Sequence, residues 1–395
     1  MEKIVVSGIG VVSPIGINRD DFYEGLLYEK TVRAIEKDAY PGHGDYKETS
    51  RLSADLKNKI DMEIENSVEL PQTLKYALYA TKTALQDAKL TSDDLAKKTV
   101  SVIIGSNDSE SEIFDYYVQN SEWSKKHYSS YNIAYKVSEY FKFNGMHFCV
   151  HNACASSNMA LELGLSFLKN NQSDLVIVGG ADSFSLKNYT GFNSLMAISN
   201  IGCRPFSKTM DGITITEGAG IIVLEKESDL SVRNKEAYCE ILGVGSSNDA
   251  YHMTRPNEQG ITLAINKAFK DAGITYKDID YIMAHGTGTQ ANDKTESSAI
   301  NHIFPDGQLK GVCSIKGTLG HMMGAAGAMG LVAICMIYKN GIIPPSSKSI
   351  PLNEECSINI ITEETKDNDI NIFMNNSFGF GGNNSVTILK SIKKK

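Results

Sequence analysis

The chain has 395 residues, of which 42% are hydrophobic and 22% charged, and its formal net charge is −8. This is the composition of a globular protein long enough to bury a large core, and the negative charge speaks against nucleic acid as a partner. The longest apolar runs are far too short to span a bilayer, so we expect no membrane association.

The opening stretch MEKIVVSGIGVVSP predicts a buried strand and lacks the charged-then-apolar layout of a signal peptide. Seven cysteines, odd in number and widely spaced, are typical of reduced thiols. We therefore expect a cytoplasmic protein.

Two stretches of the chain follow the same order of elements. A helical pattern at Thr73–Leu90 precedes a buried strand at Val100–Gly105, and a second helical pattern at Gly260–Ile274 precedes a strand at Tyr281–His285. Each stretch then continues into a helix that opens with small residues, CASSNMALELG in the first and GHMMGAAGAMG in the second. Apolar helices alternating with short apolar strands indicate a sheet covered on both faces.

We therefore predict an α/β fold built from a duplicated unit. The N-terminal half is placed at 1–238 and the C-terminal half at 239–395, with the small-residue helices packed closely in the middle. Two unrelated α/β domains are the alternative.

The stretch HFCVHNACASSNM holds two histidines and two cysteines. On a strand, His147, Cys149 and His151 would share one face and are possible zinc ligands. Structural zinc sites usually combine two ligand pairs, and no second CxxC or HxxxH occurs in the chain. We therefore expect no metal here and a buried, inert Cys149.

Cys154 lies where this strand should turn into a helix. The unpaired N–H groups and the positive end of the helix dipole at that position favour a thiolate, and they can also hold an oxyanion. The pattern predicts a nucleophile.

Two later glycine-rich segments add candidate catalytic residues. AHGTGTQANDKTE carries His285, and SIKGTLGHMMGAAGA carries Lys316 and His321. In a duplicated fold these residues and Cys154 would converge on one centre. The alternative is that each histidine caps a helix or fills the core. The glycine-dense turn NNSFGFGGNNS, with Phe378 and Phe380, either places a backbone N–H against a ligand or is only a tight turn.

The order of these motifs resembles that of the β-ketoacyl-acyl-carrier-protein synthases. The motifs are CASS, RPF…DG…EGAG, DAYHMT, AHGTGT…ND…E, SIKG…GH…GAAGA and NSFGFGGNN, and the likeness covers essentially the whole chain. The resemblance implies the thiolase-like fold, a duplicated five-layered αβαβα architecture. It also implies a decarboxylative Claisen condensation that elongates an acyl chain by two carbons.

The resemblance assigns roles to particular residues. Cys154 would carry the acyl group, His285 and His321 would polarise the malonyl thioester carbonyl, and Lys316 would support the second histidine electrostatically. The backbone N–H groups of Cys154 and Phe380 match the oxyanion hole, and Phe380 also matches a gate for malonyl. The remaining assignments are substrate binding for Thr287, Thr289, Thr254 and Phe378, and structural support for Asp293 and Glu296.

The partners that the resemblance implies are acyl and malonyl thioesters on an acyl carrier protein. No metal or dissociable cofactor is expected, because the phosphopantetheine arm arrives on the carrier. The family forms dimers, so we expect a homodimer, or a heterodimer with a ketosynthase-like subunit.

Several positions depart from the family pattern. Gly330 stands where many members carry a glutamate near the lysine, so Lys316 is expected to lack a counter-charge. Ser207 and Thr216 replace a common aspartate and glycine. Asp108 lies in a loop that in relatives helps shape the acyl pocket across the dimer interface, where a polar residue would disfavour a long saturated chain; a solvated acidic loop is the alternative. Arg255 could meet the carrier's phosphate or form a surface salt bridge.

The departures from the family pattern favour an enzyme of a polyketide or aryl-polyene-like pathway. Three other interpretations are possible. A housekeeping fatty acid synthase differs only in its acyl substrate. A non-catalytic chain-length subunit usually lacks the cysteine, but Cys154 is present. A thiolase would need a second cysteine in NNSFGFGGNN, which has none.

Overall fold

The computed structural model of the chain describes residues 2–35, 47–109, 111–113, 115, 132–305 and 307–392. The C-terminal lysines 393–395, which the sequence predicts to be a solvated tail, lie outside the described residues. The strands are β1 Ile4–Val12, β2 Ala34–Ile35, β3 Glu48–Ser50, β4 Val100–Gly105, β5 His147–Val150, β6 Leu175–Asp182, β7 Ile215–Thr216, β8 Gly218–Lys226, β9 Cys239–Asn248, β10 Tyr281–Met283, β11 Gly311–Cys313, β12 Ile342–Ile343, β13 Thr365–Lys366, β14 Ile372–Gly379 and β15 Asn383–Ser391.

The α-helices are α1 Arg19–Leu27, α2 Ala54–Glu63, α3 Gln72–Asp87, α4 Ser92–Ala96, α6 Asn132–Phe141, α7 Ser156–Lys169, α8 Leu186–Ser194, α9 Glu258–Ala272, α10 Gln290–Ile303, α11 Lys316–Leu319 and α12 Ala326–Asn340. Short 3₁₀ turns are η1 Ser67–Glu69, η2 Glu227–Arg233, η3 Tyr276–Asp278, η4 Met323–Ala325 and η5 Phe380–Gly382.

One ten-stranded sheet connects the two halves of the chain. The first half contributes strands in the order β1-β8-β6-β4-β5 and the second half in the order β9-β15-β14-β10-β11. Directions also correspond, because β4, β5 and β6 are parallel to one another, as are β10, β11 and β14. β1 and β9 join the halves through the antiparallel pairs Val5↔Glu240 and Val6↔Cys239. The division of the chain into 1–238 and 239–395 stays a prediction, since this sheet is continuous across it.

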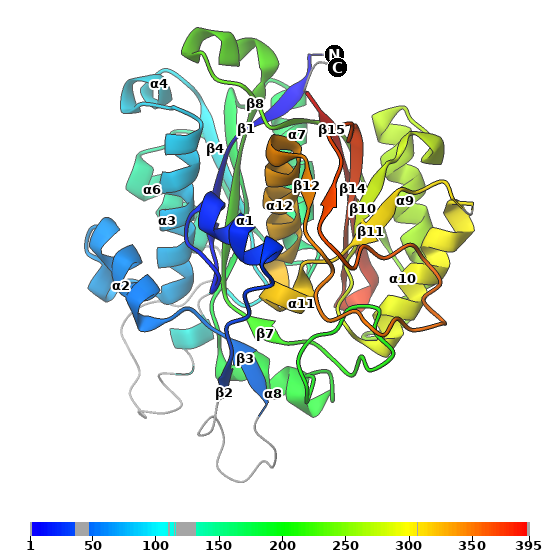
Figure 1. The fold of residues 1–395 in the computed structure, drawn as a ribbon. Coiled ribbons are helices and arrows are strands. Elements are labelled where there is room, and N and C mark those ends of the chain that lie inside the picture. Colours follow the sequence, from blue (N-terminus) through cyan, green and yellow to red (C-terminus); the bar gives the residue numbers. More distant parts are fainter. Residues whose placement is uncertain are drawn as a thin grey trace.

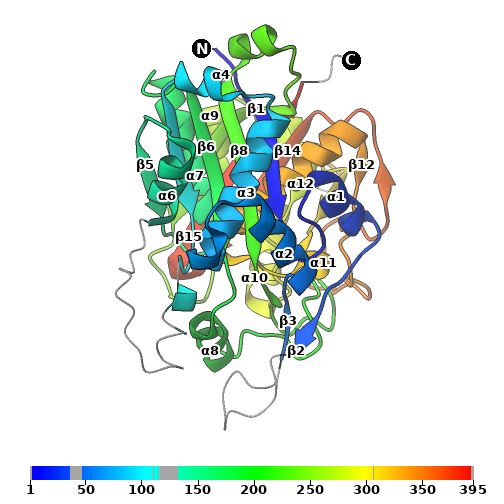
Figure 2. The same ribbon diagram turned by 90° about the vertical axis from the view of Figure 1, so that its left-hand side faces the viewer.

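The helices and strands form five layers (Figure 1). α7 and α12 lie in the middle, where α7 contacts β6 and β15 and α12 contacts β8 and β14. α3 and α6 cover the outer face of the first half, as Figure 2 shows from that side, and α9 and α10 cover the outer face of the second. Separate apolar clusters fill the outer interfaces, and the largest cluster surrounds the central helices. The predicted duplicated α/β architecture is confirmed.

Small residues let the two central helices approach closely, as the sequence predicts. A Cβ at Gly327 of α12 would lie 2.4 Å from the Asn158 side-chain oxygen of α7. The Ser157 hydroxyl accepts a hydrogen bond from the Ala328 N–H at 2.9 Å. A side chain at position 327 would therefore push the central layer apart.

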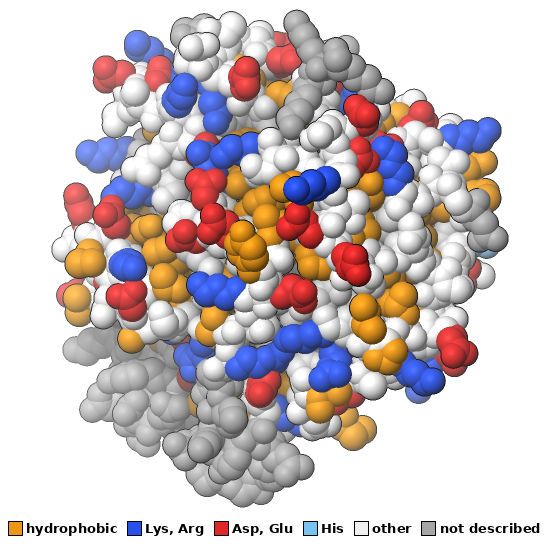
Figure 3. All heavy atoms as spheres, viewed as in Figure 1, with side chains coloured by type: hydrophobic (Ala, Val, Ile, Leu, Met, Phe, Trp, Pro, Cys, Tyr) orange, Lys and Arg blue, Asp and Glu red, His pale blue; other side chains and the backbone are white. Residues whose placement is uncertain are grey.

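The segment Met323–Asn340, which contains α12, is long and apolar enough to cross a membrane by composition, but 89% of it is buried inside the protein. A helix that is apolar on every side belongs in the core of a large domain or in a bilayer. The central position of α12 accounts for its composition. On the face seen in Figure 3, acidic and basic side chains are interspersed.

The parallel strands place the candidate residues at one edge of the sheet. Cys154 follows β5, His285 follows β10, Lys316 follows β11, and Phe380 follows β14. In sheets of this kind the carboxyl ends of parallel strands form the binding edge. The fold thus brings together residues that are up to 226 positions apart in the sequence.

Candidate active site

Cys154 lies in a tight turn between β5 and α7, as predicted. The preceding residue, Ala153, has φ +49°, an unusual value for a residue with a side chain, and α7 begins two residues after the cysteine. The Ser156 hydroxyl donates to the Ala153 carbonyl at 2.6 Å and accepts the Asn152 N–H at 2.7 Å. These bonds hold the turn, and they leave the Cys154 side chain 6% exposed at the floor of a pocket.

The end of β14 lies directly against the nucleophile turn. The Ser377 hydroxyl donates to the Cys154 carbonyl at 2.7 Å, and a Cβ at Gly379 would lie 3.0 Å from the Cys154 nitrogen. The backbone N–H groups of Cys154 and Phe380 both interact with the cysteine sulfur. Two N–H groups converging on the reacting centre form the arrangement that stabilises an oxyanion on a bound carbonyl.

Burial raises the pKa of the Cys154 thiol to about 12, although the charge of Lys316 and the two backbone N–H groups lower it. The N–H groups at the helix terminus favour the thiolate, as the sequence predicts, but burial has the larger effect on the pKa of Cys154. Desolvation outweighs the dipole because the sulfur is enclosed by apolar neighbours. The resting group is a thiol, whose proton must leave when the sulfur attacks.

His285 and His321 lie together beside the sulfur. Their ring centroids are 5.3 Å apart with planes at 82°, and ligand atoms of Cys154, His285 and His321 lie within 4.8 Å of one another. Burial and the charge of Lys316 hold the pKa of both histidines well below 6.5. Both imidazoles are therefore neutral at physiological pH.

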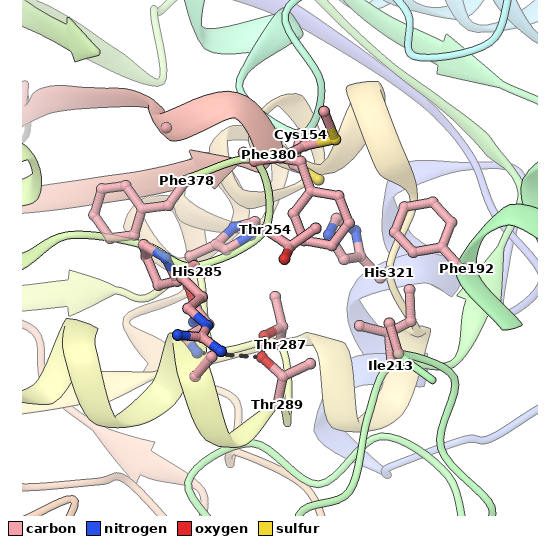
Figure 4. A pocket seen from close by; sticks show the side chains of 18 of the residues that line it. Cys154, Phe192, Ile213, Thr254, His285, Thr287, Thr289, His321, Phe378 and Phe380 are labelled. Atoms are coloured by element: carbon pink, nitrogen blue, oxygen red, sulfur yellow. Dashed lines mark hydrogen bonds between the residues drawn. The ribbon is translucent and has the colours of Figure 1, made fainter. Parts of the chain in front are cut away.

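Hydrogen bonds on the inner nitrogens fix which ring nitrogen carries the proton. The Met323 N–H donates to His321 Nδ1 at 3.2 Å, and Lys316 Nζ lies 3.4 Å from His285 Nδ1. A backbone N–H and an ammonium group can only donate, so both Nδ1 atoms are acceptors and both protons reside on Nε2. The Nε2–H groups are thus free to donate into the pocket (Figure 4).

This arrangement disfavours a metal at the three residues. A metal bound through Nε2 needs the proton on Nδ1, where a carbonyl or carboxylate would accept it. Here both Nδ1 atoms face donors, and the Lys316 ammonium adds a repelling charge. The donor set suits the binding of a developing anion better than the binding of a cation.

Lys316 contacts the first histidine. Its Nζ donates to the His285 carbonyl as well as facing His285 Nδ1. The predicted electrostatic influence of Lys316 on the second histidine is present, since its charge lowers the pKa of His321, but its hydrogen bonds go to the first histidine. Burial lowers the pKa of Lys316 itself, and Glu296 is the largest influence that opposes this effect.

Glu296 and Asp293, on α10, hold the loop that carries His285. The Glu296 carboxylate accepts the N–H groups of His285 and Gly286, both at 2.8 Å. Asp293 accepts the N–H groups of Thr287 at 2.9 Å and Gly288 at 3.0 Å. Both acids are fully buried, so they act as backbone supports.

The absence of a side chain at Gly330 leaves no open space. A Cβ at this position would lie 2.4 Å from the Asn375 side-chain oxygen and 3.4 Å from Met283. The space for a glutamate is filled by Asn375, whose amide donates to the Gly327 carbonyl at 3.0 Å. The usual counter-charge at position 330 is thus absent, and the acid that most strongly raises the pKa of Lys316 is Glu296.

The pocket above Cys154 contains ≈ 560 Å³ of empty space, its open mouth included. Thr254, Thr287, Thr289 and Phe378 line it, as does Arg255 near the mouth. The hydroxyls of Thr287 and Thr289 are 2.9 Å apart. Polar side chains that line one path to a buried sulfur suit an extended substrate arm with amide groups.

Asp108 does not line this pocket. Its carboxylate contacts the Ser185 hydroxyl and Lys187 Nζ, the latter at 2.6 Å, at the beginning of α8. The predicted role of Asp108 concerns the acyl pocket across the dimer interface, so it stays a prediction. Cys149, predicted to be buried, is only partly so. His151 Nδ1 lies 2.9 Å from the Ser106 carbonyl, so this histidine supports the turn.

Sequence reasoning missed three residues of the site. Phe192 lines the pocket from α8, outside the motifs, and His252 lines it from within the motif DAYHMT, where it was given no role. Asp182 accepts hydrogen bonds from Ser106, from three backbone N–H groups including that of Gly324, and its charge influences Cys154. The signal for Asp182 was its position at the carboxyl end of an apolar strand.

A buried thiol that can hold an acyl group, beside two neutral donors that can stabilise an enolate, defines the class of acyl-transferring condensing enzymes. Comparison with known families agrees, since the beta-ketoacyl synthase N-terminal domain matches residues 1–230 and the C-terminal domain matches residues 238–349. The chain belongs to the beta-ketoacyl synthase family.

Individual relatives span the whole chain. The 3-oxoacyl-[acyl-carrier-protein] synthase 2 of Staphylococcus aureus (strain N315) is 30% identical over 99% of both chains. The structure of the ishigamide ketosynthase/chain length factor has a TM-score of 0.92 with 29% identity, covering 99% of this chain and 100% of that one. A ketosynthase in complex with its chain length factor from Xenorhabdus doucetiae has a TM-score of 0.84 with 27% identity, covering 99% and 98%.

Proposed function

We propose that the protein is a β-ketoacyl-acyl-carrier-protein synthase that joins an acyl group on Cys154 to malonyl carrier protein. The observation that carries this proposal is the convergence of the Cys154 sulfur, two backbone N–H groups and two Nε2–H donors in one pocket. Each group matches a charge that develops in a decarboxylative Claisen condensation.

In the first half-reaction the Cys154 sulfur attacks the thioester carbonyl of the acyl carrier protein. The N–H groups of Cys154 and Phe380 hold the oxyanion, the carbon–sulfur bond to the carrier breaks, and the cysteine proton passes to the leaving sulfur. Because the pKa of the thiol is raised to about 12, the proton has to leave as the bond forms.

In the second half-reaction malonyl carrier protein loses carbon dioxide. The electron pair of the breaking bond moves onto the thioester as an enolate, whose oxygen accepts hydrogen bonds from the Nε2–H groups of His285 and His321. The enolate carbon attacks the acyl-Cys154 carbonyl, whose oxyanion again occupies the backbone N–H pair. Collapse releases the β-ketoacyl carrier protein and the Cys154 thiolate, which takes a proton from water to return to the resting thiol.

The proposed chemistry needs no metal and no cofactor held by the chain, because the phosphopantetheine arm belongs to the carrier. Thr254, Thr287 and Thr289 line the route to the sulfur and would hydrogen-bond that arm. Arg255, which lines the same pocket, would meet the phosphate that joins the arm to the carrier.

We further propose that the chain works in a type II polyketide or aryl-polyene-like pathway in the cytoplasm. Two structural relatives, each at least 27% identical, are ketosynthases named together with chain length factors. Elongation in fatty acid synthesis is the second candidate, since the Staphylococcus relative is 30% identical.

The edge strand β5 fits the dimer that we propose. Within the described residues β5 pairs only with β4, and its flank exposes Met146 by 46% and Phe148 by 40%. An open strand edge with apolar side chains is suited to pairing with another subunit. That subunit is either a second copy or a ketosynthase-like chain length partner.

The test is intact-mass spectrometry of the purified protein with saturated, short and polyenoyl acyl carrier proteins, alongside Cys154→Ala. An acyl adduct on the wild type that is absent from the variant is expected, and the preferred acyl group assigns the pathway. No adduct with any donor, alone or with an added chain length subunit, would contradict the proposed reaction.

A further inference from the structure

Phe380, which follows β14, makes an aromatic contact that the sequence does not suggest. Its ring lies 5.5 Å from the ring of Phe192 on α8, with the planes tilted by 31°. Both rings line the pocket above Cys154, and Figure 4 shows Phe192 reaching toward Phe380 from the α8 side. The backbone N–H of Phe380 is at the same time one of the two groups directed at the sulfur.

The segment that carries Phe380 is built to pivot. Gly381 and Gly382 follow it with φ values of +78° and +74°, a conformation that glycine adopts without strain. Beyond the ring the loop is held by backbone bonds, from the Gly381 N–H to the Met253 carbonyl at 2.7 Å and from the Asp249 N–H to the Gly382 carbonyl at 2.8 Å. Because these bonds hold the Gly381 N–H and the Gly382 carbonyl, the ring has a defined resting position, and its displacement requires the bond to Met253 to open.

Phe192, by contrast, is on a fixed element. The Ser185 side chain caps the start of α8, and Asp115 accepts the N–H groups of Leu186 and Lys187. α8 also packs on a small apolar cluster that includes Phe184, Tyr189, Ile198 and Ile213. One ring is therefore anchored and the other is on a glycine pivot.

We propose that Phe192 is a positioning residue that holds Phe380 in the conformation where the oxyanion N–H faces Cys154 and the ring covers the sulfur. This inference rests on the proposed function, since it assigns the order of its two half-reactions. With the ring held, malonyl carrier protein reaches the histidines only after acylation has displaced Phe380. Weakening the contact both exposes the pocket and misplaces the oxyanion donor.

The contact between two aromatic rings predicts the size of the effect. Such a pair shifts an equilibrium by roughly two- to tenfold when one ring is removed. Phe192→Leu should therefore raise carbon dioxide release from malonyl carrier protein without an acyl donor by about two- to tenfold. It should lower the rate of condensation over the same range.

The experiment compares Phe192→Leu with Phe184→Leu, which removes a ring from the same apolar cluster, and with Phe380→Ala alone and combined with Phe192→Leu. Carbon dioxide release, condensation and the labelling of Cys154 by a bulky maleimide relative to iodoacetamide are measured for each. We expect Phe192→Leu to raise carbon dioxide release and slow condensation, and Phe184→Leu to leave both rates as in the wild type. Adding Phe192→Leu to Phe380→Ala should change neither rate further.

The inference would be overturned if Phe192→Leu and the wild type had equal rates of carbon dioxide release and condensation. It would also be overturned if the effects of Phe192→Leu and Phe380→Ala on these rates added in full in the double variant. The labelling ratio separates this outcome from a failure of the proposed reaction. A wild type that neither releases carbon dioxide nor condenses would contradict the reaction, whereas the maleimide ratio still reports whether Phe192 holds the ring. Thermal unfolding of each variant shows whether the substitution has disturbed the fold.

Discussion

Replacing Lys316 with methionine tests how the histidines are tuned. Lys316 is buried and faces His285 Nδ1 at 3.4 Å, where its charge keeps the proton on Nε2. A hydrogen bond from a charged group is worth about 1.5–3 kcal/mol, and 1.36 kcal/mol is a factor of ten in rate. We therefore expect Lys316→Met to slow malonyl decarboxylation by about ten- to a hundredfold at pH 8.

The expected pH dependence of the Lys316→Met variant follows from the direction in which Lys316 shifts the pKa of His285. Burial and the Lys316 charge lower the pKa of His285, so loss of the charge lets that pKa rise. As the pH falls toward the new value, the imidazole of the variant becomes protonated on Nδ1 and keeps its Nε2–H. The rate of malonyl decarboxylation by the variant should therefore approach that of the wild type as the pH falls from 8 to 6.

The assay is release of carbon dioxide from malonyl carrier protein between pH 6 and pH 8.5, with acylation of Cys154 followed separately by mass spectrometry. Acylation should fall by less than about tenfold, because Lys316 acts on the sulfur through charge alone. Lys235→Met is the matched control, since Lys235 is also largely enclosed but pairs with Asp87 away from the pocket. The reasoning would be refuted if Lys316→Met slowed decarboxylation by the same factor at every pH, or if it slowed acylation more than decarboxylation.

Three further changes probe the site. Because the pKa of Cys154 is raised to about 12, its alkylation by iodoacetamide should rise about tenfold per pH unit between pH 7 and pH 10; a plateau near pH 8 would contradict a buried thiol. Glu296→Gln removes the negative charge that most raises the pKa of Lys316 and weakens the acceptor of two loop N–H groups, so denaturant unfolding should show a loss of about 1–3 kcal/mol; unchanged stability would refute this role. Gly330→Ala should cost about 1–3 kcal/mol through the clash with Asn375, and Asn375→Ser should restore most of that stability; a neutral Gly330→Ala would show that the space is open.

The layered fold was predictable because burial on both faces leaves a strong pattern. The strand predicted at Val100–Gly105 is β4 to the residue, and the helix predicted at Gly260–Ile274 is α9 at Glu258–Ala272. α12 is apolar on every side because it lies between the two halves of the ten-stranded sheet. Such patterns are local, so they can be read without knowing how the elements pack.

Contacts between distant segments were less predictable. The convergence of Cys154 and His285 follows from the strand-end rule, which requires only the order of elements. The contact of Lys316 with His285 depends on side-chain directions that packing sets. The same is true of the contact of Asp108 with Lys187 on α8. The pKa of Cys154 depends on how fully it is enclosed, and no sequence pattern reports that quantity.

The glycine at position 330 illustrates how a departure from a family pattern can be compensated. A glutamate there would bring a charge next to the central helices, but Asn375 and Asn158 instead form a neutral amide contact at 3.3 Å that also bonds to the Gly327 carbonyl. Neutral amides can satisfy one another without desolvating a charge, so the central layer carries no ionic cost at this point. The charge of Lys316 is then balanced from α10 by Glu296, which simultaneously holds the backbone of His285. Loss of Glu296 should therefore disturb the lysine and the histidine together, whereas a change at Asn375 should affect packing and leave the pH profile of decarboxylation as it is in the wild type.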